Sequence, residues 1–215
     1  MDADEVLTTT RAVRKRIDLG RPVPMGLIAE CIEVALQAPS GGNRQPWRFV
    51  VVTDPEKKAQ IAEYYRRAWT AYRAAQRWDY AQEDPRQQRK DAVVDSAQYL
   101  ADHFHEVPVH VIPCIEGRSE TLGHAAAAAL FGSIVPATWS FMLAARARGL
   151  GSSLTTLHLV YEREVAEILG IPPDVSQCAL VPVGYLLGDT LRPAHRLQVS
   201  QVASLNGWAQ PLPVG

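Results

Sequence analysis

The sequence has little of what marks disulfide-rich or zinc-binding proteins. Its three cysteines, Cys31, Cys114 and Cys178, are odd in number, far apart and without a CxxC pair. Such a pattern gives neither a disulfide framework nor a zinc site, and it favours a reducing compartment. The first residues, MDADE, are acidic where a secretory signal would be basic and then apolar. We therefore expect a cytoplasmic protein.

An excess of charge of one sign is also lacking. The chain has 22 Lys and Arg against 23 Asp and Glu, which gives a net charge of −1 over 215 residues. No global field then attracts nucleic acid or an anionic membrane, so neither is expected as a partner. One segment, 125–145, carries no charge and is long enough to cross a bilayer. It is mostly alanine, so we favour a helix buried in a core or a subunit interface.

Motifs for protein-only catalysis are absent. The chain has no GxGxxG fingerprint, no Walker P-loop, no HExxH motif and no convincing nucleophile–histidine spacing. His103, His105 and His110 raise a metal hypothesis, but side chains at i and i+2 of a helix diverge, so no metal site is predicted. These absences are typical of an enzyme whose cofactor supplies the chemistry.

Periodicity predicts one domain over 1–215 in which helices separate the strands. We expect strands over 47–52, 107–115 and 178–185, the second interrupted by Pro108 and Pro113. We expect helices over 24–37, from 56 onward, over 96–106, over 121–149 with a kink or break at Pro136, and over 162–169. This order suggests an α+β sandwich built around one mixed sheet.

The loop between the first of these helices and the first strand is the most informative stretch, APSGGNRQPW from Ala38 to Trp47. Its adjacent glycines allow a positive φ and let another molecule approach the main chain closely. Ser40, Asn43 and Gln45 offer donors and acceptors suited to the ring edge and ribityl hydroxyls of a flavin. The alternative is an ordinary helix-to-strand loop.

A basic stretch, TTRAVRKR, opens the chain. Thr8, Thr9 and Thr10 can cap a short helix that starts at Arg11, on which Arg11 and Arg14 are i, i+3 neighbours. Both guanidinium groups could then converge on one phosphate. The alternative is a solvated basic face.

Segment 64–95 is rich in aromatic residues and arginines. It holds six of the 16 aromatic residues of the chain: Tyr64, Tyr65, Trp69, Tyr72, Trp78 and Tyr80. Aromatic packing along a helix is one interpretation, and a cover that stacks on a flat ring is another. Binding of single-stranded nucleic acid is disfavoured by the neutral charge.

Four segments in order resemble the FMN-dependent nitroreductase family. They read TTRAVRKR, APSGGNRQPW, RGLGSSLTTLHL and LVPVGYLLGDTLRPAHR, and they span Thr8 to Arg196. The resemblance implies a dimer of single-domain chains, each a three-layer-like α+β sandwich with a mixed, mainly antiparallel sheet between helices. Segment 64–95 would be a helical lid or insert.

The resemblance also assigns an FMN site. It implies phosphate contacts from Arg11, Arg14, Lys15 and Arg196, contacts to the ribityl chain and ring edge from Ser40, Gly41, Asn43 and Gln45, and backbone donors to the ring near Thr155 and Thr156. The match is incomplete, because Thr10 and Ala12 stand where many relatives have arginine and serine. Ala194 stands where some have lysine, and whether Lys15 or Arg16 assists Arg14 is open.

The implied function is that of a homodimeric, NAD(P)H-dependent FMN oxidoreductase. A nitroaromatic, a quinone or a similar electron-poor acceptor would follow the nicotinamide into the same place, with the chemistry on flavin N5 and no catalytic side chain. Cleavage of reduced flavin or dehalogenation on the same scaffold is the alternative, and flavin sequestration is the non-enzymatic one. The sequence identifies neither the acceptor nor a preference for NADH or NADPH.

Overall fold

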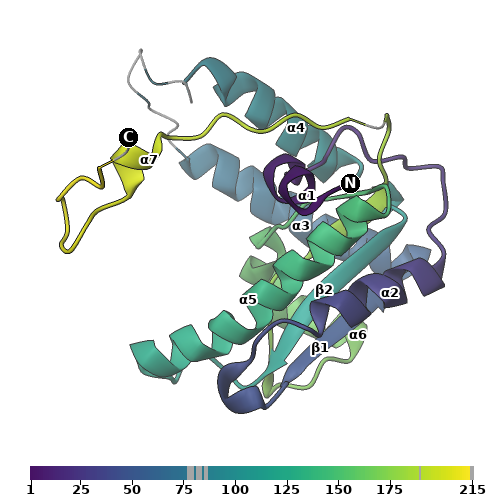
Figure 1. Ribbon diagram of the computed structural model, residues 1–215. Coiled ribbons are helices and arrows are strands. Elements are labelled where there is room, and N and C mark those ends of the chain that lie inside the picture. Colours follow the sequence, from purple (N-terminus) through teal and green to yellow (C-terminus); the bar gives the residue numbers. More distant parts are fainter. Residues whose placement is uncertain (77–79, 81–83, 85–86, 189, 214–215) are drawn as a thin grey trace.

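The computed structural model describes residues 1–76, 80, 84, 87–188 and 190–213, which form a sheet with helices on both faces (Figure 1). The helices are α1 (Ala3–Thr9), α2 (Met25–Ala35), α3 (Pro55–Ala75), α4 (Lys90–Asp102), α5 (His124–Ala147), α6 (Glu162–Leu169) and α7 (Val199–Val202). The strands are β1 (Trp47–Val52), β2 (Val109–Glu116), β3 (Leu150–Ser152), β4 (Val175–Gln177) and β5 (Val181–Tyr185).

The sheet is built around β2. The strand order is β1-β2-β5-β3, and β4 also pairs with β2. All four strand pairs are antiparallel, with Trp47 opposite Ile115 and Val52 opposite His110 in the longest of them. The predicted fold class, α+β with a mainly antiparallel sheet between helices, is confirmed.

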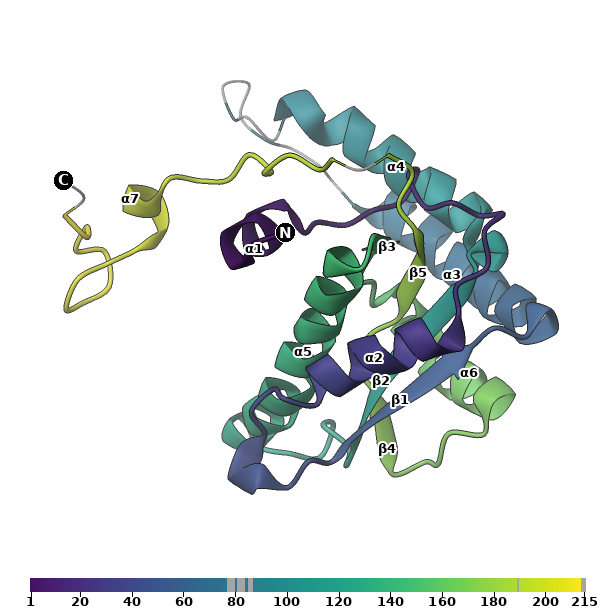
Figure 2. The same ribbon diagram turned by 45° about the vertical axis from the view of Figure 1, so that its right-hand side comes forward.

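Alternation along β2 explains the layers. Val109 and Val111 belong to the apolar cluster that includes Phe141 of α5. Ile112 and Cys114 point to the opposite face, where they join the cluster under α3. Because successive side chains of a strand point to opposite faces, one buried strand serves two cores. Figure 2 shows α2 and α5 on one side of the sheet and α3 and α6 on the other.

Several local predictions are confirmed. Strand β1 and helix α6 have the predicted bounds, and α6 ends at Gly170 with a left-handed φ of 68°. Helix α3 starts after Asp54, whose side chain accepts hydrogen bonds from the amides of Glu56 and Lys57, each at 2.9 Å. A short polar side chain at this position satisfies amides that the first helical turn leaves unpaired.

The predicted interruption of the strand at Pro113 and a break of the helix at Pro136 are wrong, although β2 does begin only after Pro108. Strand β2 continues through Pro113, which lies opposite Phe49 and whose carbonyl accepts a hydrogen bond from the Cys178 amide at 2.9 Å. Helix α5 likewise continues through Pro136. Both prolines lie in elements that tertiary packing holds on other sides, and this packing outweighs the loss of one amide donor.

Helix α5 is only partly covered within one chain. Among the described residues it is the one helix long and apolar enough to span a membrane, and 33% of its most apolar window is buried. Phe141 and Met142 pack on the sheet, whereas Phe131, Val135 and Trp139 are exposed. The predicted burial on every side is therefore not met by a single chain.

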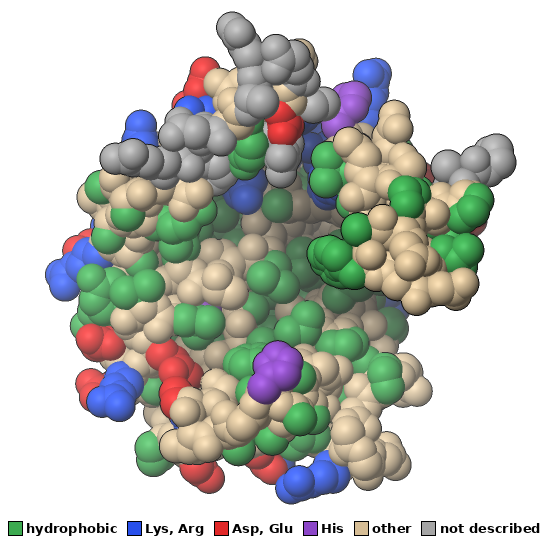
Figure 3. Space-filling view, turned by 90° about the vertical axis from the view of Figure 1, so that its left-hand side faces the viewer, with side chains coloured by type: hydrophobic (Ala, Val, Ile, Leu, Met, Phe, Trp, Pro, Cys, Tyr) green, Lys and Arg blue, Asp and Glu red, His purple; other side chains and the backbone are tan. Residues whose placement is uncertain are grey.

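The C-terminal arm, residues 190–213, extends away from the body (Figures 1 and 2). Its exposed large apolar side chains are Leu197, Val199, Val202, Leu205 and Trp208. Figure 3 shows further hydrophobic side chains on the face of the body from which the arm projects. An arm and a helix face that both expose apolar surface are typical of chains that assemble.

Candidate functional site

The basic N-terminal stretch has no helix from Arg11 and turns at residues 14–16, where the Ile17 amide donates to the Arg14 carbonyl at 3.3 Å, so the helix predicted there is wrong. The helix in this region, α1, ends before it at Thr9. The amide of Val13 donates to the Ser152 carbonyl at 2.8 Å, and the Leu187 amide donates to the Arg16 carbonyl at 2.8 Å. The sheet edge thus supplies the backbone partners that a helix would have supplied.

Two glycines let this stretch lie flat on the sheet. A Cβ atom at Gly151 would stand 2.8 Å from Cγ1 of Val13, and one at Gly184 would stand 2.6 Å from Cγ2 of Ile17. Both distances are shorter than real carbon contacts, so any side chain would push the basic stretch outward. The position of Arg14, between Val13 and Ile17 in the chain, depends on these glycines.

The basic stretch lines a cavity of about 470 Å³. Its cationic lining residues are Arg11, Arg14, Lys15, Arg16, Arg89 and Arg192, and its described lining contains no Asp or Glu. Arg16 is engaged elsewhere, since Nε and Nη1 donate to the carbonyls of Leu187 and Thr190, each at 2.8 Å. The remaining cations make the cavity chemically suited to anions.

The pKa values of the arginines reflect burial and crowding. Burial lowers the pKa of Arg14, whose Nη1 donates to Ser96 Oγ at 3.3 Å. The pKa of Arg11 is lowered by burial first, then by the charges of Arg89 and Arg196. Like charges near one another disfavour the charged form, and a bound anion would relieve this repulsion.

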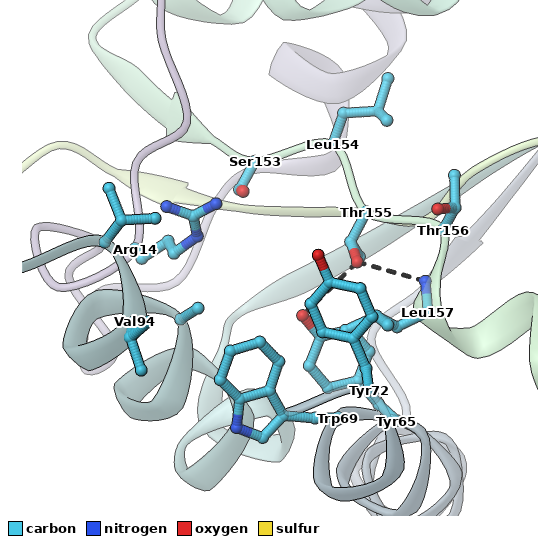
Figure 4. Close-up of a pocket in the computed structure, with 12 residues that line it drawn as sticks. Arg14, Tyr65, Trp69, Tyr72, Val94, Ser153, Leu154, Thr155, Thr156 and Leu157 are labelled. Carbon is cyan, nitrogen blue, oxygen red and sulfur yellow. Dashed lines mark hydrogen bonds between the residues drawn. The ribbon is translucent and has the colours of Figure 1, made fainter. Parts of the chain in front are cut away.

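A second cavity, of about 260 Å³, adjoins the first and shares Arg14 with it. Figure 4 shows Tyr65, Trp69 and Tyr72 of α3 facing the segment from Ser153 to Leu157. Helix α4 closes the cavity with Val93, Val94 and Ala97. The described lining is aromatic and aliphatic with one cation, which suits a flat ring.

Tyr65 is fixed in this wall from two sides. Its ring stacks on Phe104 with centroids 4.0 Å apart and an angle of 8° between the planes. Its hydroxyl lies 3.4 Å from Thr155 Oγ1. Burial raises the pKa of Tyr65, so the phenol stays protonated and can donate a hydrogen bond.

The segment after β3 is held to β5. The Thr155 amide donates to the Leu180 carbonyl at 2.9 Å, and the Leu180 amide donates back to Thr155 at 2.8 Å. The amide of Thr155 is therefore not free for a ligand, although its hydroxyl faces the cavity. Within the described part of the chain, the amides of Leu154 and Thr156 have no hydrogen-bond acceptor.

The loop that contains Ser40, Gly41, Asn43 and Gln45 has an unusual backbone. Asn43 and Gln45 both have a φ of 53°, a left-handed value that non-glycine residues seldom adopt. Ser40 Oγ accepts a hydrogen bond from the Gln45 amide at 3.1 Å, and Asn43 Oδ1 accepts one from Gln45 Nε2 at 3.2 Å. The Gly41 amide donates to Ser133 Oγ of α5 at 3.1 Å. Residues Gly41 to Gln45 of the loop are exposed.

One chain does not bring this loop to the two cavities. Ser133, to which the loop is attached, precedes Ala147 at the other end of α5 by 14 residues. At 1.5 Å per residue this is about 20 Å. Figure 2 shows the loop and the basic stretch at opposite ends of the molecule. The predicted site residues therefore form two separate groups in a single chain.

The remaining predicted residues lie as follows. Arg196 is on the arm, close enough for its charge to lower the pKa of Arg11. Lys15 and Arg11 line the basic cavity, and Thr156 lines the aromatic one. Trp78, part of the predicted lid, lies outside the described residues. The described residues contain no group of three or more His, Cys, Asp and Glu that could hold a metal ion.

Sequence reasoning missed Arg89, Ser96 and Arg192 in the basic cavity. Arg89 precedes α4 and Arg192 follows β5, so about 100 residues separate them in the chain. No motif links such distant positions. A weak signal existed for Arg192, which lies in the basic LRPAHR run.

The profile described as "Nitroreductase family" matches residues 9–185, which is most of the chain. The chain belongs to the nitroreductase family. A relative from Thermus thermophilus named NADH dehydrogenase is 35% identical over 216 residues, an alignment that covers 94% of this chain and 95% of the relative. The predictions of family and of an oxidoreductase are thus confirmed.

Solved structures agree with the nitroreductase fold. Iodotyrosine deiodinase bound to FMN and 3-iodo-L-tyrosine superposes with a TM-score of 0.73 at 23% identity, covering 95% of this chain and 99% of that one. The FMN and NADPH-dependent nitroreductase NfnB from Sphigopyxis sp. strain HMH gives a TM-score of 0.69 at 23% identity, covering 97% and 100%. At this identity the likeness shows the fold alone.

Proposed function

We propose that this nitroreductase-family protein is an FMN oxidoreductase that takes electrons from NAD(P)H and passes them to a nitroaromatic, a quinone or another electron-poor ring. The observation that carries the proposal is the place of Arg14, which lines both an anion-binding cavity and an aromatic-walled cavity. A phosphate joined to a flat ring system is the ligand that such a pair of cavities fits.

The residues present fit FMN. Arg14, Arg11 and Lys15 would hold the phosphate, and the Ser153–Leu157 segment would lie beside the ring. Flavin supplies the chemistry of hydride and electron transfer when it is bound. The unpaired amides of Leu154 and Thr156 and the hydroxyl of Thr155 could stabilise negative charge that develops on the ligand.

The aromatic wall would orient the donor and the acceptor. Tyr65, Trp69 and Tyr72 offer ring faces to either, and the described lining has no carboxylate to repel an electron-rich or anionic group. A cavity of about 260 Å³ would be filled by the flavin ring, so donor and acceptor would both have to stack on its exposed face. We therefore expect them to bind in turn, as in a ping-pong mechanism.

A second copy of the chain would complete the site. Ser40, Asn43 and Gln45 lie in the loop bonded to Ser133, about 20 Å along α5 from the C-terminal end of that helix, and none of them lines either cavity. The exposed apolar side chains Val135 and Trp139 of α5 lie on the helix that carries this loop. Pairing of two α5 helices would cover this surface and bring the loop of one chain to the cavities of the other.

Complementation between two defective chains tests this arrangement. The Arg14→Gln chain and the Asn43→Ala chain, each with its own tag, are purified alone and as the co-expressed mixed dimer. If each site uses Arg14 of one chain and Asn43 of the other, the mixed dimer has one intact site and regains about half of the bound FMN. If both residues serve the same site from one chain, the mixed dimer regains none.

Anaerobic mixing of the FMN-loaded protein with NADH and NADPH tests the reaction. Loss of the oxidised flavin absorbance much faster than for free FMN supports the oxidoreductase, whereas reduction at the free-flavin rate supports a sequestering protein. Oxygen is then admitted and the flavin is analysed. Intact FMN supports the reductase, and fragmented flavin supports the cleaving alternative.

A further inference from the structure

The basic cavity has more positive charge than one phosphate monoester requires. Besides Arg16, its lining has five cations: Arg11, Arg14, Lys15, Arg89 and Arg192. Arg11 donates one hydrogen bond to the Arg192 carbonyl at 3.2 Å and Arg14 one to Ser96 Oγ at 3.3 Å, and none of the five pairs with a carboxylate of the described residues. A phosphate monoester carries about −1.5 to −2 near neutral pH, so about two cations neutralise it. The others are left for a second anion.

Depth separates the cations into two groups. Arg14 is half-buried at the junction with the aromatic cavity, where a resident cofactor would lie. Arg89 and Arg192 are exposed at the outer part of the same cavity, one before α4 and the other at the start of the arm. Neither pairs with a carboxylate of the described residues. An exposed position suits a ligand that enters and leaves.

The closeness of like charges in the basic cavity also suggests a second anion. Arg89 and Arg196 both act on Arg11 with like charge, and no acidic side chain stands between them in the described lining. Such an arrangement destabilises the empty protein and is stabilised by a bound anion. One phosphate held at Arg14 leaves the outer charges unbalanced.

We propose that Arg89 and Arg192 bind the 2′-phosphate of NADPH, and that the enzyme therefore prefers NADPH to NADH. This inference rests on the proposed function. The electron donor must stack its nicotinamide on the flavin ring at the aromatic cavity, and the neighbouring cavity is the basic one. NADPH and NADH differ in the 2′-phosphate alone, and the planar guanidinium group binds phosphate through two parallel hydrogen bonds.

The test uses FMN-loaded wild type and the variants Arg89→Gln and Arg192→Gln, with Arg163→Gln as control. Arg163 is an exposed arginine of α6, outside both cavities. Stopped-flow reduction is followed with each nucleotide at concentrations below saturation. Wild type should react faster with NADPH. In each cavity variant the rate of flavin reduction by NADPH should fall about tenfold, a change of about 1.4 kcal/mol, and the rate with NADH should fall by less than about threefold.

A second measurement reads binding without electron transfer. Adenosine 2′,5′-bisphosphate should compete with NADPH more strongly than AMP does, and Arg89→Gln should remove this advantage. If the variants lose the same factor in rate with NADPH and NADH, the inference is overturned, because the arginines would then bind the pyrophosphate that both nucleotides share. Loss of FMN from the variants would overturn it in favour of a cofactor contact, and unchanged rates would overturn it outright.

The two proposals can fail separately. If neither nucleotide reduces the wild type, the proposed function fails and this inference falls with it. If both nucleotides reduce wild type and variants alike, the proposed function stands and only the 2′-phosphate site is refuted.

Discussion

The hydroxyl of Tyr65 lies 3.4 Å from Thr155 Oγ1, and this contact joins helix α3 to the segment that follows β3. The Tyr65 ring is 3% exposed and stacks on Phe104. The wall of the aromatic cavity is therefore part of the hydrophobic core. A change in this wall affects both the shape of the cavity and the stability of the protein.

Two substitutions separate these roles. Tyr65→Phe removes a long hydrogen bond and keeps the stack, so the free energy of unfolding should change by less than about 1 kcal/mol. Tyr65→Ala leaves a cavity beside Phe104 and should cost about 3–5 kcal/mol. Urea unfolding measures both. A large loss in Tyr65→Phe would mean that the hydroxyl, rather than the ring, supports the wall.

Arg14→Gln should weaken binding of FMN and leave binding of riboflavin almost unchanged. Riboflavin lacks the phosphate that Arg14 is proposed to hold, whereas a hydrogen bond to a charged group contributes about 1.5–3 kcal/mol. Quenching of flavin fluorescence gives both dissociation constants, and Arg163→Gln is the matched control. If both flavins lose affinity equally, Arg14 supports the ring or the fold instead of the phosphate.

Gly184→Ala should destabilise the protein by about 1–3 kcal/mol, because the new methyl group overlaps Ile17. Its ideal Cβ position is 2.6 Å from Ile17 Cγ2 and 3.2 Å from the Asp18 carbonyl oxygen. Gly26→Ala in α2 is the control, since nothing lies within 4 Å of its Cβ position. Because alanine is the better helix former, this control should gain up to about 1 kcal/mol. Thermal unfolding that ranks the two variants the other way would contradict the packing described.

Two buried histidines predict loss of stability in acid. Burial lowers the pKa of His110 and of His158 to about 3, against an ordinary value near 6.5. Below about pH 6.5 the two histidines bind protons in the unfolded chain but stay neutral in the folded chain, so the free energy of unfolding falls as the pH drops toward 3. Above about pH 6.5 both histidines are neutral in the folded and the unfolded chain, so they do not make the free energy of unfolding depend on pH.

His158→Leu isolates the effect. Neither ring nitrogen of His158 has a hydrogen-bond partner among the described residues, so the substitution removes no such bond. Between pH 7 and pH 5, wild type should lose about 2 kcal/mol more than this variant. His195→Gln, at an exposed position, should follow wild type. Parallel pH profiles for His158→Leu and wild type would show that His158 takes up a proton in the folded state.

Val135→Glu should give a monomer that binds FMN weakly. Val135 is 45% exposed on α5, on the face proposed to pair with a second copy. A carboxylate buried at such an interface is costly to desolvate. Val160→Glu, at a position that is 68% exposed outside α5, is the control. Sedimentation gives the mass and absorbance gives the flavin content; a dimeric Val135→Glu would place the interface elsewhere.

The elements that sequence predicted well are those with a strong local signal. Strand β1 is a run rich in aromatic and β-branched residues next to turn residues, and α6 ends at a glycine with positive φ. The stretch from Arg11 carried a cap signal too, but its backbone pairs with Ser152 and Tyr185, and no local pattern reports such partners. Strands β3 and β4, with three residues each, are too short to show a period.

Among the candidate site residues, too, those with a local sequence signal were predicted and those without one were not. Motifs identified Ser40, Arg14 and Thr155 as candidates, because each lies in a contiguous run with distinctive chemistry; of these, Arg14 and Thr155 line the cavities and Ser40 does not. Arg89 and Arg192 could not be found in this way, since only the fold brings them to one cavity. Sequence also gave no sign that the Thr155 amide is occupied by Leu180.

The loop with Asn43 and Gln45 is held by its own hydrogen bonds in the single chain. Two non-glycine residues at positive φ cost on the order of 1–3 kcal/mol each, and the hydrogen bonds among Ser40, Asn43 and Gln45 hold them there. Because this conformational work is done during folding, little entropy is lost when a ligand or a second chain meets the loop. A glycine at position 45 would relax the backbone and make the isolated chain more stable, at the expense of this preorganisation.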